Sequence, residues 1–357
     1  MVTLSLAARR RIVASSALTL GGRAMICPIR RLLPTAAAAA AALCFAACGT
    51  AQAVIHPPLT SLGYVPLPRE TGPGPLIDQL ILDQRVNRLY VAHTSNGALD
   101  VIDLTQAKTV ASVGGLKGIR AVALTPNPDE VYTSDGGDGT VGVVDLKAMR
   151  VVKLIPAGAA PDAIAYDPLH DVVVVALPAA HRLAFVDRSL RRVVGTVSLP
   201  GTPELMAVDA GTGQVFTAIN DRDQIAVVDD SSQQVTTVLR GCAIKAPTGL
   251  AYDSDQNRLF VADHLVMSVI DVLLDRCLGS VDIGSGTDQV ALNPHTHHLL
   301  AANAGSRNIS VIDAVSLKPV GVAGTGPRAG SLAVDPSTDR VYVALPLSGS
   351  IAILHDP

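Results

Sequence analysis

The stretch Arg340-Val-Tyr-Val-Ala-Leu-Pro346, followed by Ile351-Ala-Ile-Leu-His355, carries the pattern that decides the fold. Pairs of short apolar strands like this one recur along the chain, and an aspartate closes each earlier copy. Counting back from position 355 in steps of 42 residues, this aspartate stands at Asp313, Asp271, Asp229, Asp187, Asp145 and Asp103. A repeat of about 40 residues with several short strands is typical of a β-propeller, in which each repeat forms one blade. The sequence therefore predicts an all-β, seven-bladed propeller with four-stranded antiparallel blades.

Each repeat divides into four strands, called a to d from the axis outward. In the first repeat we expect them at residues 79–82, 89–92, 98–102 and 109–113. A second polar anchor ends each strand a, at Asp83, Thr125, Asp167, Asp209, Asp253, Asn293 and Asp335. Because a carboxylate can accept the backbone N–H groups of a tight turn, we interpret both sets of anchors as structural.

The seventh repeat supplies strands a to c but no strand d. The run Leu62-Gly-Tyr-Val-Pro-Leu67 precedes the first repeat and has no partner strands of its own. We expect this run to form the outermost strand of the last blade, so that the ring is closed by an N-terminal strand.

Residues 1–53 have a different composition from the rest, with six arginines and no acidic residue. The segment 25–31, which ends in two arginines, and the mainly apolar segment 32–45 have the order of an export signal, and the apolar part is short for a membrane span. We therefore expect a periplasmic or secreted protein that starts at Met25, with the propeller at residues 54–357. The alternative for residues 1–24 is that Arg9-Arg10-Arg11 belongs to a twin-arginine-like leader.

Two processing routes for this signal stay open. The small residues Ala51-Gln-Ala53 fit cleavage by a signal peptidase. The sequence Phe45-Ala-Ala-Cys48-Gly49 resembles a bacterial lipoprotein box, in which Cys48 carries the lipid and anchors the protein to a membrane.

Composition constrains the core and the partners. The chain is 48% hydrophobic but only 3% aromatic, which predicts blade cores of Val, Ile, Leu and Ala. Without residues 1–53, 22 of the 28 basic residues remain against 31 acidic ones, a net charge of about −9. An acidic body lacks the positive field that binds phosphate backbones, so nucleic acid is disfavoured as a partner.

Two cysteines, Cys242 and Cys277, are certain to remain after any such processing. In the repeat alignment, Cys242 follows strand d of the fourth blade, whereas Cys277 begins strand d of the fifth. This places them at opposite ends of adjacent blades, farther apart than the roughly 7 Å that a disulfide spans. We therefore expect two unpaired cysteines.

One end of the ring, formed by the d–a and b–c loops, is the predicted ligand site and is called the mouth below. Five residues before the strand-a anchor, the blades present Asp78, Arg120, Asp162, Glu204, Thr248, Asp288 and Gly330. Four carboxylates at equivalent places predict a negative concavity suited to a small cationic ligand. The alternative is that they are solvated loop residues that bind turn N–H groups.

The last position of strand b is polar in four blades and lies near the same end. It is occupied there by His93, Asp135, Asp263 and Asn303. These residue types include metal ligands, but positions on different blades predict no distance, and hydrogen bonding at strand ends is the alternative. We assign no metal site, cofactor or catalytic residue.

Strand b also carries a resemblance to a known family. It appears as Tyr90-Val-Ala-His93, Phe260-Val-Ala-Asp263 and Tyr342-Val-Ala-Leu345, and Asn303 keeps the final Asn of the motif. These repeats resemble the YVTN-repeat propellers of bacteria and are similar to the YncE-like proteins over residues 62–355. The resemblance implies a propeller. The family includes proteins described as DNA-binding, surface-exposed proteins and relatives of the haem d1 propeller.

The interpretation that follows is an exported binding or interaction module with its ligand, a small cation or a protein partner, at the mouth. One alternative is a metal-assisted enzyme at the mouth, either lactonase-like or oxidoreductase-associated. Another is a DNA-binding protein of the YncE-like kind. The chain has no C-x-x-C-H, H-E-x-x-H, P-loop or G-x-S-x-G motif, so neither an ordinary hydrolase nor a c-type cytochrome is supported.

Overall fold

The computed structural model describes residues 57–357 apart from 75, 241 and 243. The predicted export signal, with Met25 and Cys48, lies outside the described residues. Within the described part, helices occur only as single turns of 3-10 helix, and none has the length and apolar character needed to cross a bilayer.

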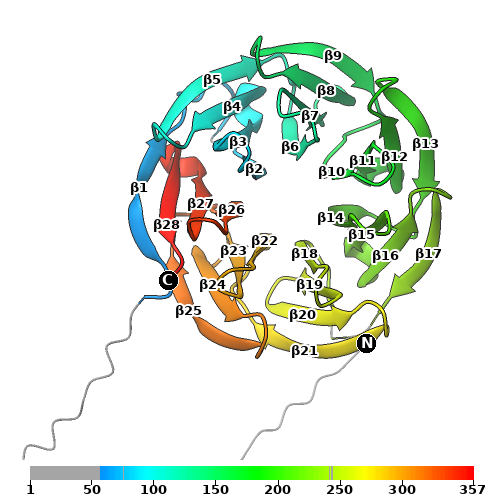
Figure 1. Ribbon diagram of the computed structural model, residues 1–357, viewed down its shortest axis with the longest axis vertical. Coiled ribbons are helices and arrows are strands. Elements are labelled where there is room, and N and C mark those ends of the chain that lie inside the picture. The colour runs from blue at the N-terminus through cyan, green and yellow to red at the C-terminus, as the bar shows by residue number, and fades with distance from the viewer. Residues whose placement is uncertain (1–56, 75, 241, 243) are drawn as a thin grey trace, which may run out of the picture. The chain divides into compact units, whose positions relative to one another are not determined.

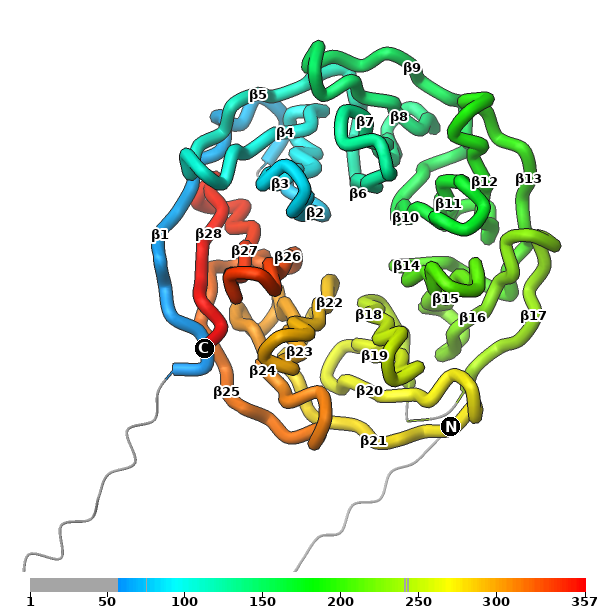
Figure 2. Tube along the Cα trace, viewed as in Figure 1, coloured from blue at the N-terminus to red at the C-terminus, as the bar shows by residue number. Residues whose placement is uncertain are grey.

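Seven separate four-stranded antiparallel sheets stand around a ring (Figure 1). The inner strands face the axis (Figure 2) and are β2 (Leu80–Asp83), β6 (Ile119–Leu124), β10 (Ile164–Asp167), β14 (Pro203–Asp209), β18 (Leu250–Asp253), β22 (Thr287–Asn293) and β26 (Leu332–Asp335). The second strands are β3 (Arg88–His93), β7 (Glu130–Asp135), β11 (Val172–Leu177), β15 (Gln214–Ile219), β19 (Arg258–Ala262), β23 (His298–Asn303) and β27 (Arg340–Leu345). The third strands are β4 (Ala98–Asp103), β8 (Thr140–Asp145), β12 (Arg182–Asp187), β16 (Gln224–Asp229), β20 (Val266–Asp271), β24 (Asn308–Asp313) and β28 (Ser350–His355). The outer strands are β5 (Lys108–Gly114), β9 (Arg150–Pro156), β13 (Arg192–Ser198), β17 (Gln234–Leu239), β21 (Arg276–Asp282), β25 (Lys318–Gly324) and β1 (Thr60–Pro66).

The predicted all-β, seven-bladed propeller is confirmed, and the strands of blade 1 begin and end within about a residue of their expected positions. Each blade is a meander, so consecutive strands pair in antiparallel register. All seven outer strands contain an irregularity where they pair with the third strand, as between Val101 and Ile102 opposite β5. Such bulges add local twist, which suits a strand that bends around the rim.

The last blade is completed by β1, which pairs with β28 from Thr60↔His355 to Pro66↔Ser350 (Figure 1). Val65, in β1, is fully buried. Leu67 N donates to the carbonyl of Gly349 at 2.8 Å. The two ends of the ring are therefore joined by a non-covalent ladder, in agreement with the expected closure.

The apolar core lies between neighbouring blades, because each cluster of buried side chains combines residues from two of them. Val, Ile, Leu and Ala make up most of it, as predicted. The few aromatic residues are concentrated there and include fully buried Tyr90, Tyr132, Tyr342, Phe185, Phe216 and Phe260. Each blade therefore stabilises its neighbour, and the whole ring forms one closed unit.

The repeated aspartates bind turns at the end of the ring opposite the mouth, called the anchor face below. Asp145 Oδ1 accepts the N–H groups of Lys147 and Ala148, both at 2.9 Å. Asp313 Oδ1 accepts those of Val315 and Ser316 in the same way. These contacts confirm the structural interpretation of the anchors.

The expectation of two free cysteines is wrong, because Cys242 and Cys277 form a disulfide with a Cα–Cα distance of 5.2 Å. Cys242 does not stay at the end of β17. Its Sγ lies 3.2 Å from the carbonyl oxygen of Val269, and its own carbonyl accepts the hydroxyl of Ser268 at 2.5 Å. The linker after β17 therefore runs alongside blade 5, a path that the alignment of regular repeats does not contain.

Candidate functional site

Backbone contacts bring both predicted sets of residues to the same end of the ring. Asp78 N donates to the carbonyl of Ala92 at 3.0 Å, and Ala92 N donates to that of Gln79 at 2.9 Å. Blades 3 and 5 repeat this pair of contacts, in blade 3 with Asp162. The start of each inner strand therefore lies beside the end of the second strand, and the mouth contains both sets.

The carboxylates of Asp78, Asp162, Glu204 and Asp288 form one electrostatic group at the mouth. Burial is the main cause that raises the pKa of Asp78, Glu204 and Asp288 to about 7 each. Charges across the ring add to it, since Asp288 and Asp162 act on Asp78, and Asp162 also acts on Glu204 and Asp288. Four acidic groups from blades 1, 3, 4 and 6 thus share one negative field.

Arg120, on blade 2, is the basic member of this ring of residues. Its Nη1 donates to Asp78 Oδ2 at 3.1 Å, and its side chain is 48% exposed. Its charge also opposes the rise in pKa of Asp162, which burial causes. One guanidinium faces four carboxylates here, so the group keeps a negative excess when the acids are ionised.

A pocket of about 240 Å³ opens between blades 2 and 3 at the mouth. Arg120 and Asp162 line it together with Pro161 and Pro178. A ligand group in this pocket would touch one positive and one negative side chain. The side of the mouth between blades 2 and 3 therefore differs in charge from the sides that present only carboxylates.

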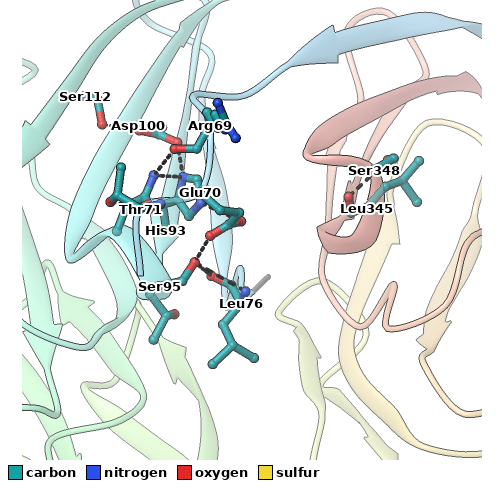
Figure 3. Close-up of polar contacts among 12 residues, drawn as sticks. Arg69, Glu70, Thr71, Leu76, His93, Ser95, Asp100, Ser112, Leu345 and Ser348 are labelled. Carbon is teal, nitrogen blue, oxygen red and sulfur yellow. Dashed lines mark hydrogen bonds and ion pairs between the residues drawn. The ribbon is translucent and has the colours of Figure 1, made fainter. Parts of the chain in front are cut away.

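His93 lies inside blade 1 and does not face the ligand space. Its Nδ1 lies 2.6 Å from Asp100 Oδ2, and its Nε2 lies 2.9 Å from Glu70 Oε1 (Figure 3). Ser112 Oγ donates to Asp100 Oδ1 at 2.5 Å, and the hydroxyl of Ser95 donates to the carboxylate of Glu70. Both ring nitrogens of His93 are therefore occupied by carboxylates of the same chain.

Asp135 is likewise buried and bound internally. Thr133 Oγ1 donates to its Oδ1 at 3.0 Å, and Thr140 Oγ1 approaches its Oδ2 at 3.4 Å. Burial raises the pKa of Asp135 to about 8 against these hydrogen bonds. A side chain at Gly142 would come within 2.8 Å of Asp135 Oδ2, so the glycine provides the space for the carboxylate.

Asp263 and Asn303 also have partners within the fold. Asp263 Oδ1 accepts the N–H groups of the b–c turn, from Leu265 at 2.9 Å and Val266 at 2.7 Å. Asn303 accepts from Thr287 Oγ1 at 2.6 Å and donates to Ser310 Oγ at 2.9 Å. The four polar strand-b residues lie at the mouth but bind partners within the fold, so they are placed apart from the group of four carboxylates.

A signal for these internal contacts is present in the sequence. Blades 1, 2 and 6 have a polar residue at the end of the second strand. In these blades the third residue of the third strand is either polar or a glycine that leaves space, namely Asp100, Gly142 and Ser310. In blades 3, 4 and 7, where strand b ends in Leu or Ile, the matching residues are Ala184, Ala226 and Ala352. Glu70 had no such signal, because it lies outside the repeats.

Comparisons with known proteins give a fold and no family. No family model matches the chain, and no curated protein matches it. Among solved structures, hydrazine synthase of Kuenenia stuttgartiensis is similar with a TM-score of 0.70 and 14% sequence identity, over 80% of this chain and 96% of that one. At this identity the likeness supports the propeller fold alone.

Proposed function

We propose that this protein is a binding module that captures a small organic polycation at the mouth. The observation that carries the proposal is the group of four carboxylates from four blades, with a raised pKa at each, opposite the single charge of Arg120. Partly buried like charges destabilise one another unless a cation lies among them. A cationic ligand would remove this repulsion, and that gain would contribute to its affinity.

The spacing of the acids favours an extended cation over a single metal ion. A compact metal site needs three ligand atoms close to one another. Within residues 57–357, less the three positions left undescribed, the one group of His, Cys, Asp or Glu that brings three ligand atoms within 4.8 Å lies elsewhere, at Asp167, His170 and Asp230. A diamine or polyamine can reach acids on several blades at once, so it fits the mouth better. For the same reason, a metal-assisted enzyme at the mouth has less support.

Location and family belong to the same proposal. We infer export to the periplasm or the medium from the arginines and the apolar run of residues 1–53, with Cys48 as the lipid attachment point if the lipoprotein route is used. The resemblance of strand b to the YVTN repeats of YncE-like proteins supports a binding role. The net charge of about −9 argues against the DNA-binding variant of that role.

The test is a calorimetric titration with spermine at pH 8 and low ionic strength, where carboxyls with a pKa of about 7 are ionised. The parent should bind, and Asp162→Asn/Glu204→Gln/Asp288→Asn should bind at least about 10-fold more weakly. A control with the same loss of charge is Asp255→Asn/Asp275→Asn/Asp282→Asn, whose three aspartates are exposed on blade 5. The proposal fails if both triple variants lose affinity equally, because the attraction would then come from net charge.

A further inference from the structure

Two carboxylates and a histidine meet between blades 3 and 4 at the anchor face, the end of the ring opposite the mouth. Asp167 ends β10, His170 lies in the turn after it, and Asp230 follows β16 of the next blade. His170 Nδ1 lies 2.8 Å from Asp167 Oδ2 and is also in ion-pair contact with Asp230 Oδ1. One ligand atom from each of the three residues lies within 4.8 Å of the other two.

Asp230 is the unusual member of this cluster. Its side chain is 1% exposed, and neither carboxylate oxygen has a hydrogen-bond partner among the described residues. The close approach of His170 does not supply a donor in bonding geometry, because that ring nitrogen is directed to Asp167. A buried carboxylate without a donor requires either a proton or a cation.

The equivalent place between blades 6 and 7 shows how the fold satisfies this carboxylate without an ion. Three repeats later, Asp356 stands at the position of Asp230, Asn293 at that of Asp167, and Thr296 at that of His170. Asp356 Oδ2 accepts from Asn293 Nδ2 at 2.9 Å and from Thr296 Oγ1 at 2.7 Å. His298 Nδ1 lies 2.5 Å from Asp356 Oδ1. Replacement of the amide and hydroxyl donors by a carboxylate and an imidazole turns this hydrogen-bonded pocket into a set of metal-ligand atoms.

Gly213 makes room for the cluster. It has a φ of +72°, and a Cβ there would lie 2.5 Å from His170 Cε1 and 3.1 Å from Asp167 Oδ2. The equivalent left-handed turn position in five other blades carries a side chain, at Asn87, Asp171, Asn257, His297 and Asp339. Gly213 is the one of these six turn positions that lacks a side chain. The imidazole of His170 uses the space that this leaves beside the two carboxylates.

We propose that Asp167, His170 and Asp230 bind a divalent transition-metal ion of the zinc class and that this ion joins blade 3 to blade 4. One imidazole and two carboxylates are common zinc ligands, and three protein ligands leave a fourth position for water. Ligand atoms around a tetrahedral ion with bonds of about 2 Å lie about 3.3 Å apart, so the cluster must open slightly. The side chain of His170 is 34% exposed and can move outward to allow this.

The experiment uses the untagged full chain, stripped with a chelator and then titrated with Zn²⁺. The parent should retain one zinc per chain after gel filtration, and its melting temperature should rise by several degrees at saturating zinc. Asp230→Asn supplies an amide donor to Asp167, as Asn293 does for Asp356, so it should fold normally and bind zinc roughly 100-fold more weakly. His170→Ala should lose zinc in the same way.

Two control variants keep the result specific. His295→Ala/His297→Ala removes exposed histidines from the same face, and the triple mouth variant removes the other acidic cluster. Both should keep the zinc response of the parent. If the parent gains no stability from zinc, the metal site does not exist. Equal zinc binding by the parent and Asp230→Asn would also overturn the proposal.

Discussion

Asp288→Asn should stabilise the protein, and the gain should be larger at alkaline than at acidic pH. The Asp288 carboxylate makes no hydrogen bond among the described residues, whereas burial, and then the charges of Asp162 and Glu204, raise its pKa from 3.8 to about 7. The asparagine has nearly the same shape and no charge. The substitution therefore removes the repulsion without removing a contact.

The direction with pH follows from the two states of the chain. The folded protein keeps the proton of Asp288 up to about pH 7, while the unfolded chain loses it near 3.8. Folding stability from this group is therefore present below 3.8 and is lost as the pH rises toward 7. The full difference corresponds to roughly 4 kcal/mol. Because the side chain keeps some exposure and the mouth acids titrate together, we expect about 1–2 kcal/mol from one substitution.

Thermal unfolding of the parent and of Asp288→Asn at pH 5 and pH 8.5 is the assay. At pH 8.5 the variant should melt about 2–6 °C above the parent. At pH 5, which lies only about a third of the way from 3.8 to 7, the gain should be well under half of that. Asp282→Asn, at an exposed position of β21, is the matched control and should follow the parent at both pH values. A variant that melts below the parent at pH 8.5, or a gain that is the same at both pH values, contradicts the electrostatic reasoning.

Three further predictions concern the fold. Deletion of residues 60–66 removes the ladder to β28 and the burial of Val65. The free energy of unfolding in denaturant should therefore fall by several kcal/mol, and a variant that unfolds like the parent would disprove the closure. Cys242→Ser/Cys277→Ser removes a cross-link that spans 35 residues and should lower the free energy of unfolding by about 3 kcal/mol. Peptide mapping of the parent without reduction should find the two peptides linked, whereas free thiols would contradict the disulfide. Burial alone lowers the pKa of His93, but its carboxylate partners raise it above 6.5. His93→Gln should therefore cost more stability at pH 5.5 than at pH 9, and equal losses at the two pH values in urea unfolding would refute this.

The sequence predicted the propeller because its information is repeated. The 42-residue spacing from Asp103 through Asp313 to position 355 places seven equivalent strands at each level of the ring, and this spacing survives variation in any one blade. The missing outer strand of the last repeat was enough to predict the position of β1. The mouth acids were found in the same way, because equivalent positions on a closed ring must lie at one end.

The contacts that were not predicted all depend on departures from the repeat. Cys242 lies in a linker longer than its equivalents, and its path beside blade 5 has no copy in another blade. Glu70 reaches His93 from a segment before the first repeat. Asp167 and Asp230 belong to adjacent repeats, and their meeting depends on how two blades pack, which the spacing within one repeat does not determine.

A crystal structure of the protein grown at pH 8 with spermine would test the central claim most directly. The account predicts ligand density within the mouth, with amine nitrogens about 2.7–3.2 Å from the carboxylates of Asp162, Glu204 and Asp288. Density for spermine on another surface, with the mouth free of ligand in crystals of the parent, would contradict it.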